Sequence, residues 1–195
     1  MANNKIKVRL KKCKICANEF TPRNSLQKCC SMECALIFAK QSKAEAEQKA
    51  NNKRKKVFRE ENKTLNALTQ EAQAAVNKYI RLRDEGKSCI SCGVPLVREG
   101  VGGGFDAGHY RSRGSAPHLR FYTLNIAGQC KRCNRYLGGN YQQFRLGLID
   151  RLGVEKVDAI EADQRARHYS QNDLRRIKKI FSKKCKLLEK RKGLF

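Results

Sequence analysis

The sequence lacks tryptophan, and aromatic residues make up only 7% of its 195 positions. Hydrophobic residues reach 40%, which is little for one large core, so we expect small metal-stapled modules joined by helices. No stretch has the roughly 18 consecutive apolar residues that a membrane-spanning helix needs, and no apolar signal-peptide core follows Met1. These absences predict a cytoplasmic protein that has no membrane partner.

Acidic residues are also scarce. Asp and Glu number 18 against 43 Lys and Arg, which gives a formal net charge of +25. A protein this basic attracts polyanions through phosphate contacts and the release of counterions. The charge therefore favours a nucleic acid as the partner, with a merely solvated basic surface as the alternative.

Cysteine, by contrast, is abundant, and eight of the ten cysteines form closely spaced pairs. Because no export signal accompanies them, we expect thiolates on zinc and not disulfides. Cys30 is preferred to Cys29 as a ligand because Cys30 and Cys34 lie one helical turn apart, which leaves Cys29 as a spare thiol. Two closed, structural zinc sites are predicted: Cys13, Cys16, Cys30 and Cys34 in one, and Cys89, Cys92, Cys130 and Cys133 in the other.

The segment inside the second site carries the candidate chemistry. Thirty-eight positions separate Cys92 from Cys130, more than a zinc ribbon usually has, and His109 lies between them. A neutral imidazole can accept a proton from water, which phosphodiester hydrolysis requires. Asn134 follows the last cysteine directly. This combination is typical of a small metal-dependent nuclease, although a lone histidine is more often structural.

These residues resemble the zinc-stapled HNH (ββα-metal) nucleases, and within them the phage NinG (Rap) recombination endonucleases. The resemblance covers nearly the whole chain and is carried by residues 106–111 (DAGHYR), 116–121 (APHLRF), Asn125-Ile126 and Gln129-Cys130-x-x-Cys133-Asn134. It implies an α+β fold: a ββα-metal core, an N-terminal zinc-knuckle module and long basic helices. It also implies an endonuclease, dependent on Mg²⁺ or Mn²⁺, that cleaves Holliday junctions or D-loops during phage recombination in a bacterial host.

The site residues follow from the chemistry and the resemblance together. His109 is the expected general base, and Asn134 offers a neutral oxygen that suits a hard cation. Many HNH enzymes place a metal ligand directly before the base, where this chain has Gly108. Asp106 is nominated in its place, against the alternative that it pairs with a nearby arginine. Asn140 is either a further Mg²⁺ ligand or a helix cap, and the resemblance implies that Asn125 fixes the backbone around His109.

Three arginines near this site are expected to grip DNA phosphates: Arg111, Arg113 and Arg120. A solvated basic loop is the alternative for each. A dimer would suit a symmetric junction, but no heptad seam supports one, so a homodimer and contacts with host or phage recombination proteins stay open. The competing functions are a less selective HNH nuclease and a non-catalytic zinc protein that binds nucleic acid.

Composition and spacing predict four regions: a zinc module (1–36), a basic helical arm (37–70), the nuclease core (71–152) and a basic helical region (153–195). The arm is helical over 35–63, where Gly and Pro are absent, and we expect it to lie exposed on DNA. A second helix spans 71–84, with its cap near Thr69 and its end at Gly86.

The core is expected to contain strands at 94–97, 105–110 and 119–121, a glycine loop at 100–104, and a helix that starts near Cys130. Helices follow over 141–152 and after Gly153. Ser170 and Asp173 predict a capping box for the last helix. On the apolar stripe of that helix, Cys185 is expected to be buried and not a ligand.

Overall fold

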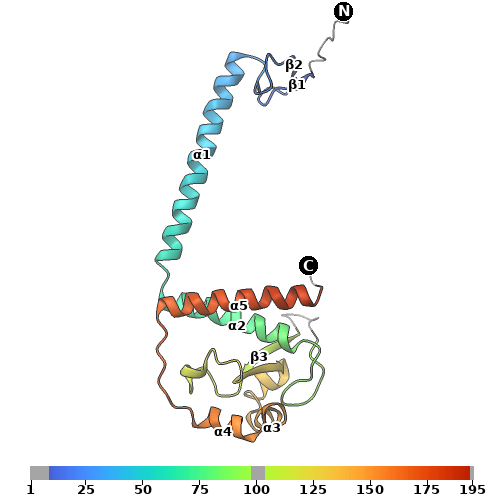
Figure 1. The fold of residues 1–195 in the computed structure, drawn as a ribbon, viewed down its shortest axis with the longest axis vertical. Coiled ribbons are helices and arrows are strands. Elements are labelled where there is room, and N and C mark those ends of the chain that lie inside the picture. Colours follow the sequence, from blue (N-terminus) through green and yellow to red (C-terminus); the bar gives the residue numbers. More distant parts are fainter. Residues whose placement is uncertain (1–8, 98–103, 194–195) are drawn as a thin grey trace, which may run out of the picture. The chain divides into compact units, whose positions relative to one another are not determined.

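The computed structural model describes residues 9–97 and 104–193 (Figure 1). Internal contacts divide the chain into two units, Met1–Lys63 and Thr64–Phe195, each of which is described separately. Both mix helices with small antiparallel sheets, so the α+β class is confirmed. Within the described residues, no helix is long and apolar enough to cross a membrane.

The first unit is a two-stranded hairpin followed by one long helix. Strands β1 (Lys11–Lys12) and β2 (Glu19–Phe20) pair antiparallel. Helix α1 (Met32–Glu61) confirms the predicted helical arm; Ser31 caps it by accepting a hydrogen bond from the Cys34 backbone N–H. None of its residues is buried in the described structure. The beginning of the chain, residues 1–8, lies outside the described residues.

The second unit begins with α2 (Leu65–Asp84), which starts earlier than predicted. Thr64, and not Thr69, is the cap: its hydroxyl accepts from Ala67 N at 3.2 Å. Thr69 lies inside the helix, where its hydroxyl donates to Leu65 O at 2.8 Å. Residues 64–70 therefore belong to the second unit, and the boundary between the two units falls seven residues before the predicted one.

The central hairpin pairs β3 (Phe105–His109) with β4 (Ile126–Cys130), so that His109 lies opposite Ile126. The predicted return strand at 119–121 is wrong. A short 3-10 helix, η1 (Pro117–Leu119), occupies that region instead, because Pro117 opens it and the Ala116 and Pro117 carbonyls accept from the N–H groups that follow.

Two other predicted core elements also differ. The strand at 94–97 is only an isolated bridge between Ser88 and Pro95, since Pro95 has no N–H to extend a ladder. Most of the predicted glycine loop lies outside the described residues. Cys130 ends β4, and the helix expected there is a single π-turn, η2 (Arg132–Tyr136). The chain then enters α3 (Tyr141–Leu152).

The C-terminal helices pack onto the same unit. Helix α4 (Val154–Ala162) follows α3, and α5 (Gln171–Arg191) runs beside α2 (Figure 1). The predicted capping box of Ser170 and Asp173 is confirmed, as is the burial of Cys185. The core between α2, α5 and the hairpin contains Leu68, Ala72, Val76, Ile80, Phe121, Ile126, Leu174 and Phe181. Burying such side chains stabilises a fold by about 1.5–3 kcal/mol each.

A buried carboxylate ties α2 to the hairpin. Asp84 is fully buried and accepts two hydrogen bonds from Arg83 and one from Gly128 N at 2.8 Å. Arg83 also donates to Ile126 O at 2.8 Å. Despite burial, which acts in the opposite direction, Arg83 and Gly128 N–H lower the pKa of Asp84 to about 2. The pair fixes β4, and with it the site, against α2.

Candidate functional site

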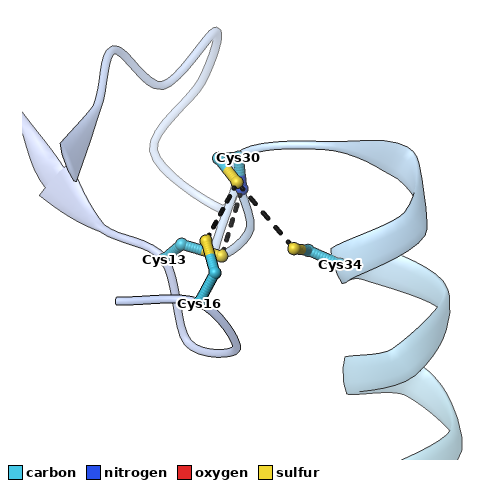
Figure 2. Close-up of side chains that lie close together, drawn as sticks. All are labelled: Cys13, Cys16, Cys30 and Cys34. Atoms are coloured by element: carbon cyan, nitrogen blue, oxygen red, sulfur yellow. Dashed lines mark hydrogen bonds between the residues drawn. The ribbon is translucent and has the colours of Figure 1, made fainter. Parts of the chain in front are cut away.

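The first cysteine cluster gathers Cys13, Cys16, Cys30 and Cys34, with all four sulfur atoms within 4.8 Å of one another (Figure 2). Two come from the turn after β1, and two flank the start of α1. Cys29 is buried but lies outside the cluster, as the sequence analysis expects of a spare thiol. The cluster therefore joins the hairpin to the amino end of α1.

The second cluster gathers Cys89, Cys92, Cys130 and Cys133 within the same limit. Its first pair follows α2, while Cys130 ends β4 and Cys133 lies in η2. Backbone N–H groups point at the sulfurs: Cys130 N lies 3.3 Å from Cys89 Sγ. The cluster thus fixes the turn that follows the β3–β4 hairpin.

The sulfur spacing in both clusters suits a tetrahedral zinc ion. Zinc–sulfur bonds of about 2.3 Å imply sulfur–sulfur separations of about 3.8 Å. The Cys16–Cys30 separation is 3.5 Å, Cys30–Cys34 is 3.9 Å and Cys92–Cys130 is 3.7 Å. These distances are far too long for disulfide bonds of about 2.05 Å. Both tetrads are therefore able to bind zinc.

The thiols of the first cluster cannot all ionise without a cation. N–H groups of Cys16 and Ile15 lower the pKa of Cys13 to about 5. Sharing its proton with the Cys16 and Cys13 sulfurs raises the pKa of Cys30 to about 12. A divalent ion would remove this conflict, because it stabilises every thiolate at once.

His109 ends β3 with its ring largely withdrawn from solvent. Its Nε2 lies 3.0 Å from the Arg120 backbone oxygen. A carbonyl oxygen only accepts, so Nε2 carries the hydrogen in the neutral ring and Nδ1 is left as the proton acceptor. Burial lowers the pKa of His109 to about 4, the Arg113 and Arg120 charges act in the same direction, and the Arg120 carbonyl opposes them. The ring is therefore neutral at physiological pH.

Asp106, on the same strand, is held by two residues of η2. Arg135 donates to both carboxylate oxygens at 2.6 and 2.9 Å, and Asn134 Nδ2 donates at 3.0 Å. The hydrogen bonds from Arg135 lower the pKa of Asp106. Asp106 therefore pairs with a nearby arginine, which is the structural alternative to a role as metal ligand. No hydrogen bond within the described residues uses the amide oxygen of Asn134.

His109, Asp106 and Asn134 line one cleft of about 350 Å³. Three arginines face it, from α2, from the loop after β3 and from η2, so its charge is mainly positive. The lining residues are Asn77, Arg81, Asp106, Ala107, His109, Ser112, Arg113, Asn134, Arg135, Gly138 and Gly139. An imidazole acceptor, one carboxylate and several guanidinium groups can together bind a phosphodiester and take a proton from water.

Asn125 is fully buried, and its side chain hydrogen-bonds the backbone just beyond His109. Its Oδ1 accepts from Arg111 N at 2.8 Å, and its Nδ2 donates to Arg111 O at 3.0 Å. Its own carbonyl accepts from Tyr110 N at 2.9 Å. These contacts hold the backbone at the end of β3 next to His109, and Asn125 does not line the cleft.

Gln129 explains why residue 108 is a glycine. A Cβ at Gly108 would come within 2.3 Å of Gln129 Oε1, so the site has no room for a side chain there. Gln129 is fully buried and donates from Nε2 to Ser91 Oγ at 2.8 Å and to Gly139 O at 2.6 Å. It thereby links the second cysteine cluster to the wall of the cleft.

Several predicted site residues lie elsewhere. Arg111 Nη1 donates to Glu161 O at 2.8 Å at the carboxyl end of α4, and Arg111 does not line the cleft. Asn140 does not line the cleft: its amide lies 3.6 Å from Cys133 Sγ, and it makes no side-chain cap. Arg113 does line the cleft. The backbone of Arg120 holds His109, and no ion pair of its guanidinium occurs within the described residues.

Three cleft residues escaped the sequence analysis: Asn77, Arg81 and Arg135. Arg135 follows Asn134 directly, and this adjacency was a usable signal. Asn77 and Arg81 lie one turn apart on α2 and carried no such signal, because only the packing of α2 against the hairpin brings them to the site.

Comparisons with known proteins add a family assignment. The sequence profile of the family described as Bacteriophage Lambda NinG protein matches residues 5–191. Protein ninG of Escherichia phage 933W is 36% identical over 190 residues, covering 90% of this chain and 92% of that protein. Protein ninG of Salmonella phage P22 is 35% identical (88% and 89% covered), and that of Escherichia phage lambda is 34% identical (88% of each). No solved structure matches the chain.

Proposed function

The chain belongs to the bacteriophage NinG family, and from this premise we propose that it is a metal-dependent DNA endonuclease with its active site in the His109 cleft. Its substrates would be branched recombination intermediates, such as Holliday junctions or D-loops. The HNH-type core, the hydrolytic activity and the branched substrate are all parts of this proposal.

The observation that carries the proposal is the state of His109. The ring is neutral, donates from Nε2 to the Arg120 carbonyl and lines a cleft that also holds three arginines. In the proposed reaction Nδ1 takes the proton of the water that attacks phosphorus. Asn125 and the Arg120 carbonyl hold the ring in place, and this spares the reaction the cost of orienting the base.

Asp106 and Asn134 would hold the catalytic cation. Mg²⁺ needs only one or two protein carboxylates, because water and substrate phosphate supply its remaining oxygens. One carboxylate and one free amide oxygen at the cleft satisfy this requirement. When bound, the ion would neutralise charge on the phosphate and on the leaving oxygen. Both oxygens of that carboxylate already accept hydrogen bonds from Arg135, so the cation would have to displace the Arg135 side chain.

The remaining cleft residues would bind the DNA backbone. Arg81 and Arg113 line the cleft and would contact the scissile and flanking phosphates, joined by Arg135 once it leaves Asp106. The net charge of +25 supports DNA as the partner. The preference for branched DNA rests on the family resemblance alone.

A second candidate is a zinc-dependent DNA-binding protein that does not cut. The pairing of Asp106 with Arg135 favours it, because a satisfied carboxylate is a poor metal ligand. Within the described residues, moreover, the two cysteine tetrads are the only clusters of three or more Cys, His, Asp or Glu side chains placed to hold a metal ion.

Purified protein should be incubated with a four-way junction, a fork and a linear duplex at equal salt, with and without Mg²⁺. The proposal predicts cleavage of the junction and fork that requires Mg²⁺ and exceeds cleavage of the duplex. Equal rates on all three would indicate a less selective nuclease. Binding without cleavage under any divalent metal would leave only the second candidate.

A further inference from the structure

A second groove adjoins the proposed catalytic cleft at His109. It has a volume of about 330 Å³ and shares His109, Ser112, Gly138 and Gly139 with the proposed catalytic cleft. Its distinctive wall is Tyr141, the first residue of α3. A group bound there would therefore lie directly beside a phosphate bound in the cleft.

The aromatic ring of Tyr141 is held in place by its contacts with Tyr110. Its ring stacks on Tyr110, with centroids 4.7 Å apart and planes 11° from parallel, and the two hydroxyl oxygens lie 2.8 Å apart in a hydrogen bond. Tyr110 is itself buried against Phe144. Tyr141 is nevertheless 52% exposed. One face of its ring is covered by Tyr110, so only the other face is left for a ligand in the groove to stack on.

The opposite wall also leaves room for a planar group. Gly138 and Gly139 have positive φ values of 56° and 88° and carry no side chains. Gly139 is fixed by its N–H to Cys133 O at 3.0 Å and by its carbonyl, which accepts from Gln129. Both walls are thus preformed, one by the core and the other by the second cysteine cluster.

The proposed catalytic cleft and the groove differ in the charge of their lining residues. The catalytic cleft is lined by Arg81, Arg113 and Arg135. The groove has one arginine in its lining, Arg111, and carbonyls at the end of α4 already engage that guanidinium. A phosphate therefore suits the cleft, whereas a neutral planar ligand suits the groove.

We propose that this groove holds one unstacked nucleobase of the DNA substrate, stacked on the open face of Tyr141, next to the phosphate in the cleft. The inference rests on the proposed function and deepens it. A base is free to leave its stack most cheaply at a branch or in a single strand. The groove would therefore favour branched over linear DNA through Tyr141, without reading sequence.

The test uses 2-aminopurine, whose fluorescence falls when it stacks, at successive positions through the branch point of a forked DNA. Binding is measured without added Mg²⁺, so that no strand is cut, and His109 is kept because it lines the groove. Tyr141→Leu removes the π-face but keeps apolar bulk, whereas Tyr141→Phe keeps the ring and serves as the matched control. Thermal melting and zinc content check the fold of each variant.

We expect quenching at one position near the branch, preserved in Tyr141→Phe and lost in Tyr141→Leu. Tyr141→Leu should also bind the fork roughly 5- to 150-fold more weakly, with duplex affinity unchanged. Unchanged quenching in Tyr141→Leu, or equal loss of fork and duplex binding, would overturn the inference. Metal-dependent cutting, assayed with His109 intact, reports on the proposed function separately. A variant that cuts forks and duplexes as wild type does would refute only the role of Tyr141.

Discussion

The two cysteine clusters begin with the same local turn, but they lie in different structural surroundings. In each, the fourth residue after the first cysteine returns its N–H to that cysteine: Ala17 to Cys13 O at 3.1 Å and Gly93 to Cys89 O at 3.0 Å. Both of these residues have positive φ, 60° and 76°. The first cluster leads into α1, which buries no residue, whereas the second lies inside the core beside the cleft.

The role of a cysteine tetrad therefore depends on which parts of the chain it holds together. At the second cluster, Cys133 is followed by Asn134, and Gln129 ties the knuckle residue Ser91 to Gly139. The described part of the first unit offers no comparable link to a histidine or carboxylate. Only the second cluster is therefore expected to control catalysis directly.

The largest predicted effect is the loss of one cluster or the other. Zinc binding contributes about 10–16 kcal/mol to folding in small zinc modules, which is comparable to the whole stability of a domain, about 5–15 kcal/mol. Cys133→Ser should unfold the core and abolish cleavage. Cys13→Ser should release one zinc and unfold the first unit while the core keeps its own melting transition.

Zinc content, calorimetry and cleavage on the same samples check this prediction. If Cys133→Ser retained a cooperative core and full cleavage, or if Cys13→Ser removed the core transition, the division of roles between the clusters would be wrong. Cys29→Ser is the control, because Cys29 lies outside the first cluster, and it should retain both zinc ions.

The next effect concerns the carboxylate beside the second cluster. Among the described residues, Asp106 is the acidic one that lines the cleft. Asp106→Asn removes its charge, so cleavage should fall by about 10²-fold or more, as expected for lost transition-state electrostatics. DNA binding should remain close to wild type. An equal loss of both would indicate that Asp106 is structural, and its pairing with Arg135 would then be its whole role.

Arg135→Ala should have the opposite effect on metal binding. Its ion pair with Asp106 is partly exposed to solvent and is therefore weak. Freeing the carboxylate should tighten Mn²⁺ binding about five-fold, as measured by calorimetry or electron paramagnetic resonance. Arg132→Ala, an exposed arginine outside the cleft, is the matched control. Unchanged Mn²⁺ affinity in Arg135→Ala would place the cation away from Asp106.

The pH dependence is a further test of the histidine. Because the pKa of His109 is lowered to about 4, the base is unprotonated at pH values above 4. Cleavage should therefore stay nearly constant from pH 7.5 down to about 5 and decline only as pH approaches 4. An acid limb centred near 6.5, with both zinc ions retained, would show that the ring is not buried as described.

The smallest predicted effect concerns the turns at Ala17 and Gly93, which follow the first cysteine pair of each cluster. A non-glycine residue at positive φ costs about 1–2 kcal/mol, so Gly93→Ala should destabilise the core by about that amount. Ala17→Gly should stabilise the first unit by less, since glycine gains freedom in the unfolded chain. Thermal or denaturant unfolding measures both. Opposite signs are predicted, and equal signs would show that the two turns are not equivalent.

Local signals in the sequence predicted local features. The cysteine spacings predicted both tetrads, and Ser170 with Asp173 predicted the last capping box. What the sequence did not indicate depends on packing over long sequence separations. The return strand predicted at 119–121 is wrong because β4 pairs with β3, and no local pattern predicted that Gln129 packs against Gly108 or that Arg111 contacts the carboxyl end of α4. None of these partners is near in sequence, so no spacing rule could indicate them.

The most direct test of the central claim is the rate of single-turnover cleavage of a branched DNA by His109→Ala, compared with His168→Ala. His168 is exposed and outside the cleft, so its loss should change nothing. Loss of His109 should slow Mg²⁺-dependent cleavage by about 10²–10⁴-fold while DNA binding and zinc content remain. Cleavage by His109→Ala at the wild-type rate would contradict the assignment of this cleft as the active site.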